Sequence, residues 1–390
     1  MAEAYIVAAT RTAGGRKGGR LREWHPTDLA GTVLDNLIDR SGVDPNVVED
    51  VIMGCVTQAG EQSTNVARNA VLSSKLPESV PGTSVDRQCG SSQQAMQFAA
   101  QAVMSGTMDV VIAAGVESMT RCPMGMSVML PLKAGLGQPK SPHQEERYPN
   151  IQFSQFMGAE MVAKKYGLTK DQLDEFGYMS HQRAIAATQA GAFKDEILVL
   201  DGKDAEGNTV RHDADEGIRF EASLEAMKGV KLLQEGGALT AATSSQICDG
   251  ASGVMVVSEK ALKEYGLTPL ARIHHLLVIG HDPVIMLEAP IPATLRALKK
   301  AGMSIDDIDL FEVNEAFASV PVAWLKETGA DPDRLNVNGG AIALGHPLGA
   351  SGTKLMTTLL NALKARGKRY GLQTMCEGGG LANVTIVERL

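Results

Sequence analysis

Hydrophobic residues in the first 120 positions alternate between the period of a strand and the period of a helix. Residues 5–9 and 51–53 are short apolar runs typical of buried strands, and a third run follows Asp109. Between them, residues 29–38 and 95–103 place their apolar side chains on one face of a helix. This alternation predicts a parallel or mixed sheet with helices on its faces.

The alternation is lost between about residue 122 and residue 240. Prolines recur from residue 122 to residue 150 in a stretch rich in Met, Gly and Lys, and helical periodicity returns at 157–166 and 173–190. A charged, glycine-containing stretch follows at 201–219. Long irregular segments of this kind are usually lids or binding loops. We therefore expect an insertion that packs over the sheet domain.

The alternation resumes after residue 270. Apolar runs of strand or helix length occur at 273–279, 294–301, 310–313, 355–363, 370–375 and 384–387. A polar or glycine-rich turn, an apolar helix and a short strand follow one another near residue 89 and again near residue 346. The pattern suggests two versions of one plan, but identity between them is too weak to establish a duplication. We predict one half from residues 1–121 completed by 246–269, an insertion at 122–245 and a second half at 270–390.

Composition and charge exclude several classes of protein. The chain has 390 residues, 44% of them hydrophobic and 21% charged, which is enough to build a large core. Its net charge of −8 does not favour binding to nucleic acid or to an anionic membrane. The densest basic cluster, at residues 11–22, carries no aromatic ladder for stacking bases. We expect no nucleic-acid partner and no membrane partner.

The cysteines and the first residues indicate the compartment. The five cysteines are widely spaced and form no Cys-x-x-Cys pair, so we expect one or two reactive thiols rather than disulfides or a zinc site. The apolar run at residues 4–9 is too short for the core of a signal peptide, and no stretch approaches the about 18 apolar residues of a membrane span. No His-Glu-x-x-His motif is present, and we expect no metal. These features favour a cytoplasmic protein.

Cys89 is the first candidate for chemistry. It lies between a short predicted strand and an amphipathic helix. A thiol at a helix N-terminus is close to the positive end of the helix dipole, which lowers its pKa and favours the thiolate. Gly90 would allow a sharp turn and the close approach of a substrate. This segment alone fits either a catalytic thiol or a buried small hydrophobic residue.

Three other candidates lie in the last 80 residues. His346 stands in a stretch with five glycines at 339–352, which lacks both the dinucleotide and the P-loop fingerprint. Cys376 ends an apolar run before three glycines that form either a ligand-facing turn or a flexible connection between strands. Asn314 also ends an apolar run, where its amide could orient an oxyanion or cap the next helix.

Taken together, these segments resemble the thiolase family from end to end. The matching motifs are QCGSS around Cys89, NEAFA at 314–318, GGAIALGHPLGASG at 339–352 and CEGGG at 376–380. The resemblance implies an α/β thiolase fold of two similar halves that form a five-layer αβαβα sandwich. The inserted segment would be the loop domain that binds coenzyme A (CoA). Family members are dimers or dimers of dimers, so a homodimer or homotetramer is implied.

The resemblance also implies an activity. The chain would be an acyltransferase that cleaves a 3-oxoacyl-CoA with CoA to acetyl-CoA and a shortened acyl-CoA, or runs the reverse condensation, by ping-pong through an acyl-Cys89 intermediate. CoA would be a co-substrate, with no tightly bound cofactor. His346 would activate Cys89, and Cys376, with a pKa near neutral, would exchange protons with acetyl-CoA and with the CoA thiol. Asn314 would hold the water that completes one oxyanion hole with His346, and the backbone N–H groups of Cys89 and Gly378 would form the other.

Residues that would contact the substrate carry over from the family less directly. Arg219 and Ser245 align with CoA contacts, although residues 240–245 lack the glycine common in the family at that place. Met157 and Phe317 would lie beside the acyl pocket, under the loop rich in Pro and Met. Met-rich walls adapt to bulky groups.

The closest resemblance is to bacterial degradative thiolases of fatty-acid β-oxidation and lipid metabolism, some of which act on steroid-derived acyl-CoAs. The asparagine of NEAF separates the chain from sterol-carrier-type thiolases. A short-chain acetoacetyl-CoA thiolase of biosynthetic type is the alternative.

Proteins of other classes share part of this pattern. A nicotinamide oxidoreductase needs the GxGxxG fingerprint after the first strand, which residues 11–15 do not provide. A non-catalytic acyl-CoA binding protein would tolerate the loss of Cys89, His346 or Cys376. A thioesterase-like hydrolase would not need Cys376. All three residues are present, which favours thiolase chemistry.

Overall fold

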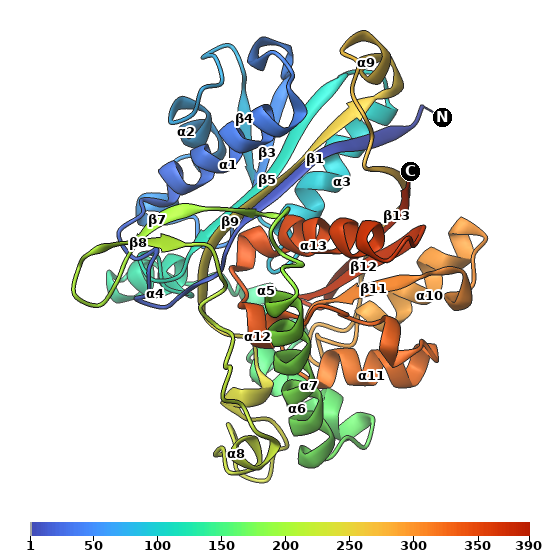
Figure 1. The fold of residues 1–390 in the computed structure, drawn as a ribbon. Helices are drawn as coiled ribbons and strands as arrows, with labels where there is room; N and C mark the ends of the chain where they lie inside the picture. The colour runs from blue at the N-terminus through green and yellow to red at the C-terminus, as the bar shows by residue number, and fades with distance from the viewer. Residues whose placement is uncertain (1) are drawn as a thin grey trace.

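The fold consists of two sheets with the same strand order, and the computed structural model describes it for residues 2–390 (Figure 1). The N-terminal sheet runs in the order β1-β9-β5-β3-β4 and the C-terminal sheet in the order β10-β13-β12-β11. The strands of the first are β1 (Ala4–Thr12), β3 (Asp50–Gly54), β4 (Gly82–Val85), β5 (Val110–Ser118) and β9 (Cys248–Ser258). Those of the second are β10 (Ala271–Gly280), β11 (Leu310–Val313), β12 (Tyr370–Glu377) and β13 (Leu381–Arg389).

Strand directions also match between the two sheets. In the N-terminal sheet β1 pairs antiparallel with β9, β9 pairs antiparallel with β5, and β5 pairs parallel with β3. In the C-terminal sheet β10 pairs antiparallel with β13, β13 pairs antiparallel with β12, and β12 pairs parallel with β11. A parallel bridge between Phe311 and Leu335 stands where β4 pairs with β3 in the N-terminal sheet. The two halves therefore share one topology. Tyr5 pairs with Arg272 and Ile6 with Ala271, so β1 and β10 join the halves into one 11-stranded sheet.

Helices cover both faces of each sheet. The N-terminal half has α1 (Pro26–Ser41), α2 (Val66–Leu72), α3 (Ser91–Met104) and α9 (Glu259–Glu264), and the C-terminal half has α10 (Pro290–Ala301), α11 (Ser319–Thr328), α12 (Ala341–Leu344) and α13 (Ser351–Ala365). The apolar faces of α1 and α2 pack on one side of the N-terminal sheet, and those of α10 and α11 on the far side of the C-terminal sheet. α3 and α13 share a core between the two sheets. The layers follow the expected αβαβα order.

Local sequence accounts for these elements. α1 begins with Pro26 and ends before Gly42, whose φ of 73° is a left-handed conformation that glycine adopts readily. β5 and β9 are buried along their whole length, which explains why they are apolar runs rather than alternating ones. Because α3 and α13 are buried on most sides, their N-terminal ends lie deep in the molecule.

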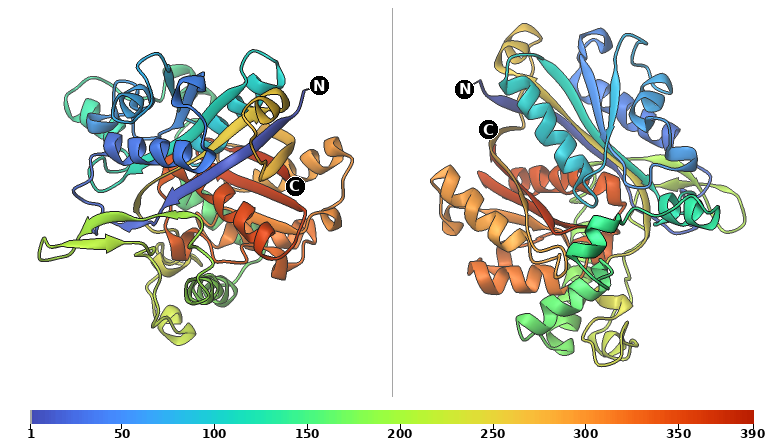
Figure 2. Two further views of the ribbon diagram at one scale, coloured as in Figure 1. Left: turned by 45° about the horizontal axis from the view of Figure 1, so that its top comes forward. Right: turned by 180° about the vertical axis from the view of Figure 1, so that it is seen from behind.

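The insertion packs on both halves. Its helices are α4 (Met126–Lys133), α5 (Pro142–Arg147), α6 (Gln155–Lys165), α7 (Lys170–Gln189) and α8 (Leu224–Lys228), and its strands are β6 (Ile197–Leu198), β7 (Leu200–Lys203) and β8 (Thr209–His212). The remaining short strand, β2 (Gly15–Arg16), belongs to the N-terminal half. α6 and α7 join the core of the C-terminal half, while β6 pairs with β1. In Figure 1 and in the right panel of Figure 2 these helices extend below the sheets. The hairpin of β7 and β8 occupies part of the stretch predicted only as charged and glycine-containing.

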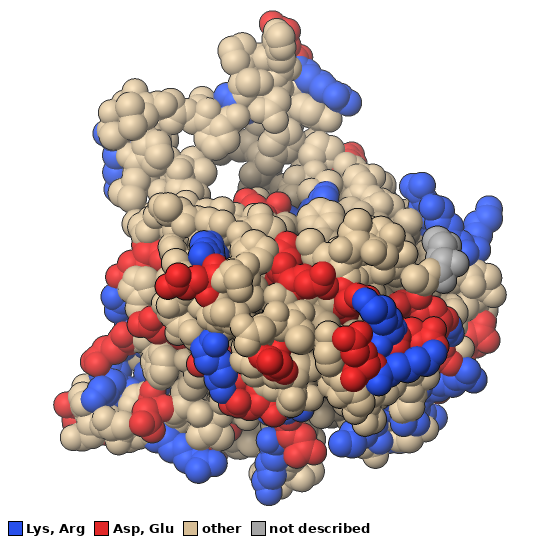
Figure 3. Space-filling model, turned by 90° about the horizontal axis from the view of Figure 1, so that it is seen from above, with Lys and Arg blue, Asp and Glu red and all other residues tan. Residues whose placement is uncertain are grey.

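The surface carries charges of both signs. On the face shown in Figure 3, Lys and Arg side chains are interspersed with Asp and Glu, and no continuous basic field covers it. Among residues 2–390, no helix is both long enough and apolar enough to cross a membrane.

Candidate active site

A strained turn carries Cys89 from β4 into α3. Gln88 has a φ of 48°, in the left-handed region that a residue with a side chain seldom adopts. Its backbone N–H donates to Asp86 Oδ1 at 2.8 Å, and Ser91 Oγ donates to its carbonyl at 2.6 Å. These local hydrogen bonds hold the turn, and Cys89 lies directly before Gly90, the N-cap of α3.

The Cys89 thiol is buried, and its pKa is raised to about 12. Burial is the main cause, and Glu377 would add to it when its carboxyl group is ionised. The prediction of a thiol activated by the helix dipole is therefore wrong, because the desolvation of a thiolate outweighs the dipole here. A thiol of this kind reacts only when a base takes its proton during the attack.

His346 is buried, and a hydroxyl orients its ring. Nδ1 lies 2.5 Å from Ser351 Oγ, which donates its own hydrogen to the Pro347 carbonyl at 2.9 Å. Ser351 therefore accepts from the ring, which assigns the ring hydrogen to Nδ1 and the lone pair to Nε2. Burial, together with the charge of Lys354, lowers the pKa of His346 to about 3, so the imidazole is neutral. The ring can act as a base through Nε2.

Asn314 donates a long hydrogen bond to this nitrogen. Its Nδ2 lies 3.3 Å from His346 Nε2, and its Oδ1 is buried without a hydrogen-bond partner among residues 2–390. Its backbone N–H donates to the Thr374 carbonyl at 3.1 Å, and the next helix, α11, begins only at Ser319. The alternative role of Asn314 as a helix cap is therefore wrong, and the amide is available to a polar group in the site.

Cys376 and Gly378 lie where β12 ends. Burial and the neighbouring Cys89 thiol raise the pKa of Cys376 well above its usual value, so the prediction of a second thiol with a pKa near neutral is wrong as well. A Cβ on Gly378 would lie 2.9 Å from Gln88 Oε1, so this glycine packs against the residue before Cys89. The three glycines close the hairpin of β12 and β13 with positive φ at Gly379 and Gly380. The hairpin brings the second thiol to the first.

Two buried charged residues that the sequence analysis missed hold the loop of His346. Lys354 Nζ donates to the carbonyls of Leu344 at 2.5 Å and Gly345 at 3.1 Å. Glu315 Oε2 accepts from the Ile342 N–H at 3.1 Å in the same loop. One signal was available, because Lys354 directly precedes the apolar run at 355–363 in a helix that the sequence predicts to be buried. A buried lysine needs acceptors, and backbone carbonyls at the preceding turn are within its reach.

Four segments distant in sequence thus meet at one place. They are the turns before α3 and α13 and the ends of β11 and β12, which carry Cys89, His346, Asn314 and Cys376. Cys89 packs with Leu348, two residues after His346, and with Met375. The arrangement combines two buried thiols, one neutral base and one amide.

Comparisons with known proteins agree with this geometry. Residues 4–260 match the thiolase N-terminal domain and residues 267–389 match the thiolase C-terminal domain. The chain belongs to the thiolase family. The expected α/β thiolase fold and the acyltransferase class are confirmed.

Individual relatives cover the chain completely. The steroid 3-ketoacyl-CoA thiolase FadA6 of Mycobacterium tuberculosis (strain ATCC 25618 / H37Rv) is 52% identical over 392 residues, which span 100% of this chain and 95% of that protein. The 3-ketoacyl-CoA thiolase of Yersinia pestis (strain Pestoides F) is 43% identical over 399 residues and 100% of both chains. The crystal structure of human mitochondrial 3-ketoacyl-CoA thiolase superposes with a TM-score of 0.90 at 34% identity, over 100% of this chain and 99% of that one.

The residues expected to contact CoA are not grouped in one place. Arg219 lines a groove of about 510 Å³ in this thiolase, together with His181, Phe220 and Met227. The backbone N–H of Arg219, not its side chain, donates to His181 Nδ1 at 3.3 Å. The Arg219 side chain is exposed. Ser245 does not line this groove. Its N–H donates to the Ala316 carbonyl at 2.9 Å, beside NEAFA.

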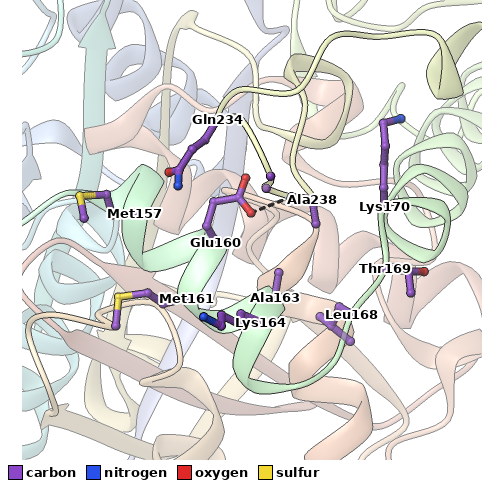
Figure 4. A pocket seen from close by; sticks show the side chains of 12 residues that line it. Met157, Glu160, Met161, Ala163, Lys164, Leu168, Thr169, Lys170, Gln234 and Ala238 are labelled. Carbon is purple, nitrogen blue, oxygen red and sulfur yellow. Dashed lines mark hydrogen bonds between the residues drawn. The ribbon is translucent and has the colours of Figure 1, made fainter.

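The residues expected at the acyl pocket lie near the start of α6. Met157 is 54% exposed and lines a second groove of about 670 Å³ between α6 and the loop at 234–238 (Figure 4). Glu160 crosses this groove and accepts from the Ala238 N–H at 2.8 Å. Phe317 is buried and contacts Phe156 edge-on, with 5.4 Å between the ring centroids. Met157 and Phe317 therefore lie on either side of the start of α6.

The two grooves are distinct from the thiols. Their lining residues include none of Cys89, Asn314, His346 and Cys376. Within residues 2–390, no three His, Cys, Asp or Glu side chains are grouped so that they could hold a metal ion.

Proposed function

We propose that this thiolase cleaves a 3-oxoacyl-CoA with CoA to give acetyl-CoA and a shortened acyl-CoA, and that it also catalyses the reverse Claisen condensation. One observation carries the proposal. Two buried thiols, Cys89 and Cys376, share a site with a neutral His346 whose Nε2 is available as a base. Thiolysis needs one nucleophilic thiol and one proton donor for the carbanion that leaves.

In the first half-reaction Cys89 Sγ attacks the C3 ketone while its proton passes to His346 Nε2. The bond between C2 and C3 then breaks and leaves an acyl group on Cys89. The released enolate of acetyl-CoA takes a proton at carbon from the Cys376 thiol. His346 is then positively charged and Cys376 negatively charged, so the two opposite charges stabilise each other inside the buried site.

In the second half-reaction the incoming CoA thiol gives its proton to the Cys376 thiolate. The CoA sulfur attacks the thioester on Cys89, and the shortened acyl-CoA leaves. The Cys89 thiolate recovers its proton from His346. Both thiols and the imidazole return to the neutral forms that their pKa values favour in the resting enzyme.

Polar groups at the site stabilise the oxyanions of these steps. Asn314 would hold a water through its unpartnered Oδ1, and with His346 it would form one oxyanion hole. The backbone N–H groups of Cys89 and Gly378 would form the other. The contact between Gly378 and Gln88 supports this pairing. Each such donor contributes about 3–4 kcal/mol to transition-state stabilisation.

The substrate groups follow from the grooves and the relatives. Arg219 in its groove would bind the anionic end of CoA, with Ser245 nearer to the thioester. Met157 and Phe317 would border the acyl group. The name of the 52% identical relative supports a bulky or steroid-derived acyl group, and the other names support fatty-acid β-oxidation. We also propose a cytoplasmic enzyme that needs no tightly bound cofactor.

The division of the chain supports a division of labour. Residues 1–121 with 246–269, and residues 270–390, would form the catalytic halves, and residues 122–245 the loop domain that binds CoA. The shared topology of the two sheets supports these limits. By family resemblance the enzyme would be a homodimer or a homotetramer, which analytical ultracentrifugation would distinguish.

The CoA-dependent loss of 3-oxoacyl-CoA enolate absorbance tests the function. Acetoacetyl-CoA and a bulky 3-oxoacyl-CoA are run in parallel, with Cys89→Ala as control. We expect turnover that disappears in the variant, a faster rate for the bulky substrate and a stable acetyl group on Cys89 in mass spectra. Free acetate instead of the adduct would indicate a hydrolase. Binding without turnover in folded wild-type protein would indicate an acyl-CoA binding protein.

A further inference from the structure

Glu377, the last residue of β12, has a buried carboxyl group with no hydrogen-bond partner. The side chain is fully buried, and neither carboxyl oxygen has a partner among residues 2–390. An ionised carboxylate without donors in a dry interior is far more costly than a neutral acid. The surroundings of Glu377 therefore favour its protonated form.

This carboxyl group lies against the turn of Cys89. A Cβ on Gly90 would lie 2.0 Å from Glu377 Oε1 and 2.4 Å from Asn383 Oδ1, so both oxygens face the same small space beside Gly90. Asn383 Oδ1 also lacks a partner among the described residues. Two acceptor oxygens that meet in a buried space repel each other unless one of them carries a hydrogen. A proton on Glu377 donated to Asn383 satisfies both.

The same asparagine reaches the helix that Cys89 precedes. Asn383 Nδ2 lies 3.2 Å from Gln94 Oε1 and 3.3 Å from Gln97 Oε1, both on α3. A hydrogen bond from Glu377 to Asn383 would thus continue from the hairpin of β12 and β13 into α3. It would link the segment of Cys376 to the segment of Cys89.

Charged groups around Glu377 do not neutralise it. Arg87 and the backbone N–H of Asn383 lower its pKa, but burial prevails and holds the pKa well above the usual value. The Cys89 and Cys376 thiols face it, and its negative charge would raise the pKa of both. Asp86 and Glu117 also raise the pKa of Cys89. An ionised Glu377 would therefore add to a negative environment.

Glu117 provides an internal reference for a buried glutamate. It stands near the end of β5, the strand that corresponds to β12 in the other half, and it is equally buried. Its Oε1 accepts from the Thr57 N–H and from Gln62 Nε2, both at 3.0 Å, and its Oε2 accepts from the N–H groups of Val56 and Gly349, both at 2.9 Å. Burial raises the pKa of Glu117 as well, but these four N–H donors oppose the shift and suit a carboxylate, whereas no N–H among residues 2–390 makes a hydrogen bond of good geometry with Glu377.

We propose that Glu377 is a positioning residue of the active site. As a neutral acid it donates to Asn383, ties the β12–β13 hairpin to α3 and supports the Cys89 turn; a negative charge on it would oppose the Cys89 thiolate. The proposal rests on the proposed function, in which Cys89 is the nucleophile.

Infrared difference spectroscopy of the full-length protein against Glu377→Gln tests the protonation state. At neutral pH we expect the C=O stretch of a carboxylic acid to disappear in the variant. The antisymmetric band of a carboxylate in its place would overturn the proposal. Glu117→Gln is the matched control, and we expect it to remove a carboxylate band.

Alkylation of Cys89 by iodoacetamide, followed by mass spectrometry across alkaline pH, tests the coupling. In wild-type protein ionised Glu377 opposes the thiolate, so the rise in rate with pH is expected at higher pH than in Glu377→Gln. Superimposable curves would overturn the coupling. Glu117→Gln also removes a nearby negative charge, but Glu117 acts less on Cys89 and should give a smaller displacement.

Thiolysis separates positioning from charge. Glu377→Gln keeps a donor for Asn383, and we expect its kcat within about threefold of wild type. Glu377→Leu leaves Asn383 Oδ1 unpaired, and we expect kcat to fall about tenfold or more with KM unchanged. An equal loss in both variants would contradict the proposal. If wild type showed no thiolysis the proposed function would fail, while the infrared and alkylation results would still decide the state of Glu377.

Discussion

The turns that carry Cys89 and His346 occupy corresponding places in the two halves but are held in different ways. Each precedes a helix of the central layer, and each has a residue with positive φ directly before the side chain proposed as catalytic, Gln88 with φ 48° and Gly345 with φ 78°. The Cys89 turn is held by its own hydrogen bonds, to Asp86 and Ser91. The His346 turn has the matching local bond, from Ser351 Oγ to the Pro347 carbonyl, and two buried charged side chains hold it as well: Lys354 on the helix that follows and Glu117 of the other half.

The difference explains why both groups stay neutral before substrate arrives. Burial raises the pKa of Cys89 and lowers that of His346; nearby carboxyl groups add to the first shift and the charge of Lys354 adds to the second. A pre-formed pair of thiolate and imidazolium is therefore disfavoured, and the proton moves only as the thiol attacks. The comparison teaches that corresponding turns can rely on local bonds alone or on local bonds together with buried charged side chains, and that burial, reinforced by these charges, sets the protonation state.

Removing the charge that holds the His346 turn should have the largest effect. Lys354→Met leaves two buried carbonyls without their donor and removes the second cation beside Asp215, which keeps Arg11, so the free energy of unfolding should fall by about 3–5 kcal/mol. Chemical denaturation measures this fall. Lys364→Met, on an exposed position of the same helix, is the control and should change stability by less than about 0.5 kcal/mol. Equal stability of the two variants would show that the turn does not depend on Lys354.

Glu117→Gln should weaken the same turn by a smaller amount. Whichever way the amide is placed, its NH₂ group faces two N–H donors that had bonded one carboxylate oxygen. We expect the free energy of unfolding to fall by about 2 kcal/mol.

Glu377→Gln should behave in the opposite way. Because burial raises the folded-state pKa of Glu377, wild-type stability should fall relative to this variant as pH rises above the ordinary carboxyl pKa. Denaturation of both variants at acidic and neutral pH checks the two signs.

Ser351→Ala should act mainly on His346, although it also removes the bond from Ser351 Oγ to the Pro347 carbonyl. The ring loses the acceptor for its Nδ1 hydrogen, so the tautomer that exposes the Nε2 lone pair is no longer selected. We expect kcat to fall about tenfold, which is about 1.4 kcal/mol, with KM unchanged. Steady-state thiolysis kinetics measure both constants. A rise in KM at constant kcat would contradict a role in orienting the base.

The smallest effect should come from the residue before Cys89. Gln88→Gly relieves a left-handed conformation but adds freedom to the unfolded chain, so stability should change by less than about 1 kcal/mol. Thermal denaturation checks this. The matched exchange in the other turn, Gly345→Ala, meets Cys248 Sγ at 2.6 Å and should be clearly destabilising. A large loss in Gln88→Gly would mean that the Gln88 side chain itself holds the turn.

Local patterns were sufficient to predict most regular elements. The periods of α1, α3 and α13 appear within single helices, and β1 and β5 are apolar runs because both their faces are covered. Patterns failed where tertiary contacts determine the structure. α4 contains Pro131 and buries none of its residues, and the β7–β8 hairpin carries several charged residues. Neither element therefore shows the hydrophobic periodicity that burial of one face produces.

Short sequence motifs were sufficient to predict the reactive residues of the site. Cys89, Asn314, His346 and Cys376 were predicted from residue type, glycine-rich surroundings and family resemblance, and the structure brings them together. Arg219, Ser245, Met157 and Phe317 remain predictions, and the structure distributes them around the insertion.

The order of elements and the reactive side chains follow from the amino-acid sequence, because helix period, apolar runs and glycine turns are properties of neighbouring residues. The protonation states do not. The sequence places Cys89 at a helix N-terminus and predicts a lowered pKa, whereas burial and Glu377, 288 positions further along the chain (377 − 89), raise it to about 12. Ser351 as the partner of His346 and Asn383 as the partner of Glu377 also depend on which segments meet. Solvation and electrostatic interaction depend on distance in space, and only the packing of the two halves determines that distance.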